Sequence, residues 1–136
     1  MATKTIFNPL LEEGFQKITV NHTQTITTTN GTATAFLNPK TISNNSVQSF
    51  ITRVTAIQAT TGHVSVWEYK GAIKNLAGVT TMVDTIVAEQ LAIDPLATTW
   101  TTNFTSVGGQ LRLEAVGQVG KTIKWYAETI FHELTF

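Results

Sequence analysis

The sequence has no cysteine among its 136 residues, which excludes disulfides, thiolate nucleophiles and cysteine-ligated metal sites. It is also poor in charge, because Asp, Glu, Lys and Arg make up only 13 % of it, about half the usual share. Nine positive side chains balance nine negative ones, whereas a phosphate-binding surface needs an excess of positive charge. No apolar run approaches the roughly 20 residues of a membrane-spanning helix. We therefore expect no partner among nucleic acids or membranes.

The sequence is rich in β-branched side chains. Threonine occurs 26 times and valine and isoleucine 11 times each, so 48 of the 136 residues are β-branched. These side chains are stiff at χ1 and pack well on a pleated sheet. Turn-forming residues recur every 8–14 residues, which is typical of a β-sandwich or jelly roll. The sequence therefore predicts an all-β fold, an antiparallel β-sandwich or jelly-roll-like barrel.

The first residues of the chain differ from the rest. Residues 1–16 lack a strict alternation, and we expect them to form an extended N-terminal arm. Residues 17–136 are predicted to form a single β-sandwich domain. The arm either lies along a neighbouring subunit or a capsid shell, or covers an open end of its own barrel. Its candidate partner-binding residues are Ile6, Phe7, Pro9, Leu10, Leu11 and Phe15.

Local patterns give more detailed predictions. Residues 17–29 alternate, and the following Asn30-Gly31 is the strongest short-range signal for a two-residue type I′ hairpin. Residues 47–59 fit a helix or a strand by spacing, and their β-branched content favours a strand. Residues 86–94 lie in a predicted strand, with a short helix ended by Pro95 as the alternative.

Residues that could support catalysis are scattered along the sequence. His22, His63 and His132 stand apart, without a second ligand at metal-binding spacing. Carboxylates in the middle of predicted strands are explained by cross-strand pairing with basic side chains. Residues 117–122 end like a phosphate loop but have the wrong glycine spacing, so they are interpreted as a hairpin turn. We expect no catalytic residue, no metal, no cofactor, and a protein that is not an enzyme.

The three tryptophans allow two interpretations. Each lies in an alternating segment near another aromatic residue, which predicts a core of large aromatics between two sheets. Trp67, Phe104 and Trp125 are the predicted core aromatics. Trp100 is flanked by threonines on both sides, so it is the candidate for an alternative role, in which an exposed ring stacks on a sugar.

Four motifs follow one another between residues 63 and 128. They are VSVWEYKGAIKN (64–75), TTMV (80–83), LATTWTTNFTSVGGQLRLEAVG (96–117) and GKTIKWYAE (120–128). This series resembles the small β-domains of bacteriophage tail-fibre, tailspike and head-decoration proteins. The resemblance covers roughly half the chain and implies a trimer-forming β-sandwich on a virion, without enzymatic activity.

Two main functions are open for such a domain, and a polysaccharide hydrolase, which needs two carboxyl groups converging in a cleft, is a third alternative. The chain begins with Met and has no coiled-coil heptads or β-helical repeats, so we expect a complete short protein rather than part of a long fibre. The favoured hypothesis is a capsid decoration (cement) protein, made in the bacterial host cytoplasm. It would bind the major capsid protein as a homotrimer on the outer surface of the phage head and stabilise the shell. The alternative is a tail adsorption module that recognises a host surface glycan.

Overall fold

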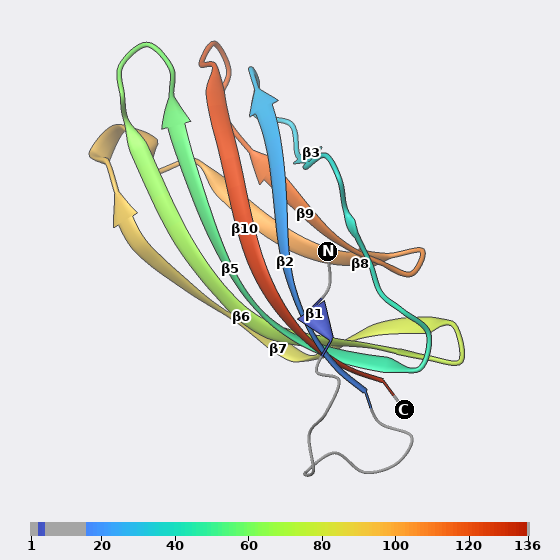
Figure 1. The fold of residues 1–136 in the computed structure, drawn as a ribbon. Coiled ribbons are helices and arrows are strands. Elements are labelled where there is room, and N and C mark those ends of the chain that lie inside the picture. Colours follow the sequence, from blue (N-terminus) through green and yellow to red (C-terminus); the bar gives the residue numbers. More distant parts are fainter. Residues whose placement is uncertain (1–2, 5–15, 136) are drawn as a thin grey trace.

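The computed structural model describes residues 3–4 and 16–135, which form two antiparallel sheets packed face to face (Figure 1). The all-β antiparallel fold predicted from the sequence is confirmed. The larger sheet has six strands in the order β1-β2-β10-β5-β6-β7. Their bounds are β1 Thr3–Lys4, β2 Gln16–Thr28, β10 Ile123–Thr135, β5 Ser46–Gln58, β6 Val64–Leu76 and β7 Val79–Ile93.

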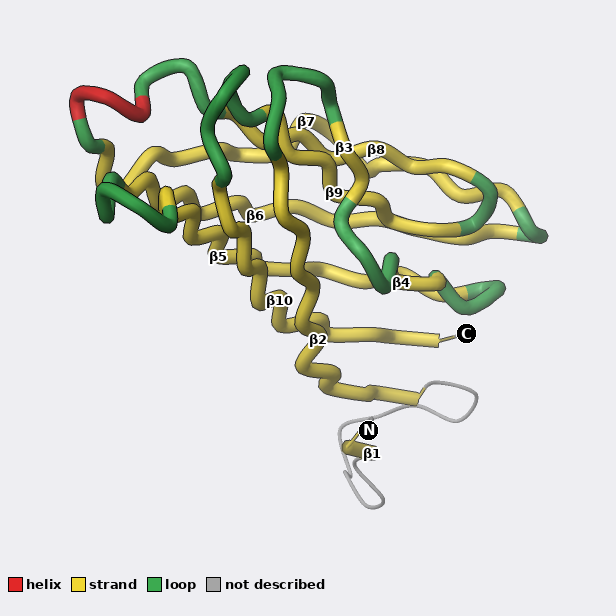
Figure 2. The backbone as a smooth tube through the Cα atoms, turned by 90° about the horizontal axis from the view of Figure 1, so that it is seen from above, coloured by secondary structure: helices red, strands yellow, loops and turns green. Residues whose placement is uncertain are grey.

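The smaller sheet packs against one face of the larger sheet (Figure 2). Its central strand is β9 (Gln110–Val116), with β8 (Thr101–Val107) on one side. The short strands β3 (Thr34–Ala35) and β4 (Lys40–Thr41) pair with the other side of β9. A 3₁₀ turn at Pro95–Ala97 lies between β7 and β8. Within the part of the chain that the structure describes, no helix is long and apolar enough to cross a membrane.

The alternation of β5 shows how the sequence builds this sandwich. Its even-numbered residues are all buried, whereas its odd-numbered residues are half-buried or exposed. Phe50 and Val54 therefore face the smaller sheet, and Ile51 and Arg53 face outward. A spacing of four residues keeps two side chains on one face in a strand as well as in a helix, which explains why spacing alone left both open. The strand predicted for residues 47–59 is confirmed.

Three tryptophans join the two sheets in one half of the core. Trp67 on β6 and Trp125 on β10 stack with ring centroids 5.7 Å apart. Trp100, which follows the 3₁₀ turn, packs against Trp125 at a centroid distance of 6.2 Å. The indole N–H of Trp125 donates to Thr28 Oγ1 at 2.9 Å, so this buried donor is satisfied.

Strand β7 contains a bulge that lets it stay paired with β6. Asp84 has a φ of 63°, and its side chain accepts the backbone N–H of Thr85 at 2.7 Å. The bulge places Ile86 over Gly71, where a Cβ would lie 3.1 Å from both Ile86 Cγ1 and Phe50 Cζ. Because β7 continues to Ile93, the alternative of a helix over residues 86–94 is wrong.

The type I′ hairpin predicted at Asn30-Gly31 is also wrong. Neither residue has a positive φ, and Asn30 Oδ1 instead accepts the backbone N–H of Thr32 at 2.9 Å. Beyond this bend the chain leaves the larger sheet, and β3 pairs with β9. The crossing brings Phe36 into the core, where it packs edge-on against Trp125 at 6.4 Å. Burial of a large aromatic side chain, about 1.5–3 kcal/mol, outweighs the turn preference of an Asn-Gly pair.

Tyr69 connects the two sheets on the side where β7 faces β8. Its ring is buried, and its hydroxyl donates to the Thr102 carbonyl at 3.4 Å. Burial raises the pKa of Tyr69 from 10.0 to about 12. Since the folded-state pKa lies above the unfolded value, the stability linked to this group is fully present below pH 10 and lost as the pH rises through 12. We expect absorbance titration to show a tyrosine ionising near pH 12 that is missing in Tyr69→Phe; identical titrations above pH 10 would contradict this.

Candidate functional site

The larger sheet has an outer face, turned away from the smaller sheet, that is lined by every second residue of each strand. Strand β10 lies near the middle of this face, between β2 and β5. Three shallow hollows lie along β10 on the outer face. We name them the upper, middle and lower hollows, in order from the start of β10 to its end.

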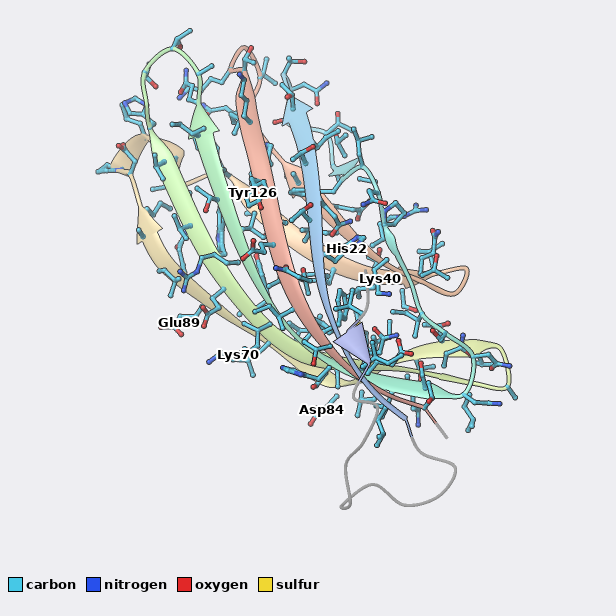
Figure 3. The ribbon with its side chains drawn as sticks, in the orientation of Figure 1. His22, Lys40, Lys70, Asp84, Glu89 and Tyr126 are labelled. Carbon is cyan, nitrogen blue, oxygen red and sulfur yellow. The ribbon has the colours of Figure 1, made fainter. Side chains whose placement is uncertain are left out.

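The upper hollow has a volume of about 350 Å³ and contains Tyr126, which is 45 % exposed. The Tyr126 side chain is labelled in Figure 3. The strand register pairs Tyr126 with Thr25 on β2 and with Thr55 on β5, so hydroxyl groups flank the phenol ring on both sides. The ring therefore lies beside hydroxyl groups, and the ammonium group of Lys124 lines the same hollow. This combination suits a ligand with apolar C–H faces and hydroxyl edges. The other lining residues are Ile26, Thr27, Leu37, Ile57, Lys124 and Trp125.

The middle hollow, about 190 Å³, contains an ion pair. Arg53 donates to Glu68 Oε2 at 2.9 Å, and the ammonium of Lys70 lies 3.6 Å from Glu68 Oε1. The hydrogen bond from Arg53 is the main cause that holds the pKa of Glu68 below its ordinary 4.5, and attraction by Lys70 adds to it. The ionised Glu68 is therefore a hydrogen-bond acceptor only. Ile51, Glu128 and Ile130 complete the lining.

The lower hollow, about 330 Å³, is less polar. Ser49 and His132 face each other across β5 and β10, with Val47 and Leu134 next to them. Glu133 lies between His132 and Leu134 on β10 and also lines this hollow. Its side chain is buried on the inner face, where Gln48 Nε2 donates to Glu133 Oε2 at 2.7 Å.

The structure places Trp100 in the core. The residue is 1 % exposed, its indole N–H lies 3.3 Å from Gln118 Oε1, and its ring packs against Trp125. A ring enclosed in this way has no face free for a sugar, so the geometry argues against the glycan-stacking role. Trp67 and Trp125 lie in the same buried cluster, and Phe104 is partly buried against it.

The predicted site residues of the N-terminal arm and the observed site residue Tyr126 differ. The arm residues Ile6, Phe7, Pro9, Leu10, Leu11 and Phe15 lie outside the described residues. Tyr126, in contrast, is a site residue that the sequence analysis did not single out. The signal was present, because successive side chains of a strand point to opposite faces. If Trp125 lies on a strand and points into the core, the next residue, Tyr126, must point to the outer face.

The titratable residues are arranged differently from their order in the sequence. In residues 3–4 and 16–135, no group of three or more His, Cys, Asp or Glu side chains could hold a metal ion. His22 Nε2 lies 2.7 Å from the carbonyl oxygen of Asn38, and its ring packs against the buried Phe131, whereas His132 lines the lower hollow on the opposite face of the sheet. Two carboxylates, those of Glu68 and Glu128, line the same hollow, on either side of Arg53 in the register.

Comparison with known proteins identifies the fold. Neither a protein-family model nor a curated protein matches the sequence. The structure is similar to a tailspike protein of Acinetobacter baumannii phage AM24, with 13 % identity and a TM-score of 0.50, over 85 % of this chain and 26 % of that one. It is also similar to a tailspike protein of Acinetobacter baumannii bacteriophage Fri1, a capsular polysaccharide depolymerase, with 14 % identity and a TM-score of 0.45, over 95 % of this chain and 19 % of that one.

The likeness to the phage AM24 tailspike protein shows the class of fold that the chain adopts. Both neighbours are much longer than this chain, which spans 26 % of one and 19 % of the other. At identities of 13 % and 14 % the similarity is one of fold. The chain has a β-rich fold similar to a part of that bacteriophage tailspike protein.

The expectation that this chain is not an enzyme is corrected by the comparison. The tailspike protein of phage Fri1, one of the two neighbours, is itself a capsular polysaccharide depolymerase. The expectation rested on carboxylates that are far apart in the sequence, whereas the sheet brings Glu68 and Glu128 into one hollow. The likeness itself covers 19 % of the depolymerase and assigns no activity to this chain.

Proposed function

We propose that this chain is a tail module of a bacteriophage virion and that it binds a host surface glycan through the upper hollow. The fold similarity to the phage AM24 tailspike protein, at a TM-score of 0.50, supports a tail protein over a capsid decoration protein. We therefore prefer the adsorption hypothesis to the one that the sequence analysis favoured. The homotrimer and the contact with a major capsid protein stay predictions.

The setting of Tyr126 is the observation on which the proposal rests. Its exposed ring can stack against the C–H face of a sugar, while Thr25 and Thr55 can exchange hydrogen bonds with the sugar hydroxyls. Threonine side chains are short, so ordering them around a ligand costs little conformational entropy. A volume of about 350 Å³ falls within the usual range of small-molecule sites, about 300–1,000 Å³.

The pattern of the face favours a glycan over a protein partner. Exposed aliphatic side chains such as Ile51, Ile57 and Ile130 are present, but Thr55, Arg53 and other polar side chains lie between them. A protein interface has a core depleted of charged residues, whereas a hydroxyl-rich surface with single apolar side chains suits a polyhydroxyl ligand.

Replacing Tyr126 with alanine is expected to weaken glycan binding at least about tenfold, which corresponds to about 1.4 kcal/mol. The stacking surface is lost, while the fold is kept because the ring is exposed. Tyr126→Phe keeps the ring and should retain most of the affinity. The measurement is a glycan array with the wild-type protein, followed by titration calorimetry of each variant with the glycans that bind.

A matched control is Val107→Ala, which removes an exposed apolar side chain from the smaller sheet, away from the hollow. It should bind glycan as the wild type does. The proposal fails if no surface glycan on the array binds the wild-type protein, or if Tyr126→Ala binds as tightly as the wild type.

A further inference from the structure

The three hollows form one line along β10. Each is lined by a pair of outward-facing residues of this strand, and each pair begins four residues after the one before. At a rise of about 3.4 Å per residue, neighbouring hollows are roughly 14 Å apart. Strand β5 lines all three as well, so the line runs along the strands and not across them. The β10 pairs are Lys124 and Tyr126, Glu128 and Ile130, and His132 and Leu134.

The charges of the residues that line the three hollows cancel. Lys124 and Arg53 are positive and Glu68 and Glu128 are negative, while the carboxylate of Glu133 faces the inner side of the sheet. Beside the middle hollow, the positive Lys70 next to Glu68 is offset by the negative Glu89, which pairs with Glu68 in the register. An acidic polymer would be drawn to an excess of positive charge, and a basic one to an excess of negative charge. The line has neither, so its charge balance is complementary to an uncharged ligand whose groups both donate and accept hydrogen bonds.

The hollows are also linked to one another. The Tyr126 hydroxyl lies 3.5 Å from Glu128 Oε2, at the boundary between the upper and middle hollows. Ile130 and Ile51 lie directly opposite each other in the register and provide an apolar floor beyond that boundary. Aromatic ring, polar pair and aliphatic floor therefore follow one another along the strand, as the faces and edges of successive sugars would require.

We propose that the outer face binds a linear, uncharged polysaccharide that lies along β10 and occupies all three hollows. This inference rests on the proposed function and adds the shape, charge and direction of the ligand. A single sugar fills one hollow only. A chain of several sugars makes contacts in each hollow, and linked contacts strengthen one another through their effective concentration.

The test uses variants that separate a ligand along the strands from one across them. Ile130→Ala changes the middle hollow and His132→Ala the lower one, both along β10 from Tyr126. Val66→Ala is the matched control, because Val66 lies on the outer face in the same row as Tyr126, paired with Thr55, but on β6. Two strand spacings of about 4.8 Å place it nearer to Tyr126 than Ile130 is.

Binding is measured by titration calorimetry with linear neutral and linear acidic bacterial polysaccharides and with size-graded oligosaccharide fragments of each. Affinity should rise with the length of neutral fragments until they span three hollows. For the longest fragments, His132→Ala and Ile130→Ala should each cost roughly three- to tenfold, and Val66→Ala less than about twofold. For the shortest fragments, Tyr126→Ala alone should matter.

The outcomes separate this inference from the proposed function. If short and long fragments bind equally tightly and only Tyr126→Ala weakens them, the function stands and the extended mode is overturned. Dependence on Val66 with no effect of His132→Ala would also overturn it, as would binding confined to acidic polymers. If no polysaccharide binds, both fail.

Discussion

Replacing Trp125 with alanine is expected to lower the free energy of unfolding by about 3–5 kcal/mol, in the range measured for large-to-small core substitutions. Its indole stacks on Trp67 and also contacts Trp100 and Phe36, which come from three other segments of the chain. Alanine would leave a cavity between the two sheets and would remove the indole N–H that donates a hydrogen bond to Thr28 Oγ1. No other side chain joins so many of the described aromatic residues.

This prediction is checked by urea unfolding followed by circular dichroism, with Tyr126→Ala as the control. Tyr126 is the next residue of β10 and points to the opposite face, so its loss should change the stability by no more than about 0.5 kcal/mol. Ordinary substitutions lower the free energy of unfolding by about 1 kcal/mol. If Trp125→Ala lowered it by less than this, the described packing would be contradicted.

Gly117→Ala is expected to destabilise the fold by about 1–3 kcal/mol, as overpacking of a filled core does. An added Cβ would collide with Thr28 Oγ1 and would lie 3.0 Å from the carbonyl oxygen of Asn30. Thr28 cannot turn away without giving up the indole N–H of Trp125. The Asn30 contact is with the backbone, which has no rotamer to change.

The control for this substitution is Gly31→Ala, because a Cβ on Gly31 would have its nearest neighbour, the Gly117 carbonyl oxygen, at 4.0 Å. We expect it to unfold within about 0.5 kcal/mol of the wild type. A double-mutant cycle tests the cause. In a Thr28→Ala background, Gly117→Ala should cost at least about 0.5 kcal/mol less than in the wild type. Equal costs in the two backgrounds would rule out the collision with Thr28.

The long strands could be predicted from the sequence because their two faces meet different surroundings. Residues 17–29 and 47–59 were predicted as strands, and β2 and β5 occupy Gln16–Thr28 and Ser46–Gln58. In both strands every second side chain faces the core, so buried and outward-facing positions alternate along the sequence with a period of two. Boundaries shift by one residue, as is usual at strand ends.

The connection after β2 could not be predicted, because its cause lies elsewhere in the chain. Asn30-Gly31 has the composition of a tight hairpin, and no local pattern opposes it. The deciding interactions are those of Phe36 with Trp125 and of β3 with β9, which are distant in the sequence. The turn preference of Asn30-Gly31, about a kcal/mol, is smaller than the free energy gained by burying the large side chain of Phe36.

The candidate site shows the same division. Threonines on both sides of Trp100 made it look exposed, but the chain turns there and encloses its ring beside Trp125. Tyr126 follows from strand alternation alone. The hollow around it does not, because its lining comes from β2, β5 and β10, and only the pairing of these strands brings Thr25 and Thr55 beside the ring.

The position of β10 has a consequence for how the domain folds. It is the last strand in the sequence, yet over 13 residues it pairs with β2 on one edge and with β5 on the other. Contacts between residues so distant along the chain slow folding to the range of milliseconds to seconds that is typical of β-sandwiches. Until β10 inserts, β2 and β5 each present an unpaired backbone edge to other chains, so a truncation before Ile123 would divide a continuous sheet and leave two edges that promote aggregation.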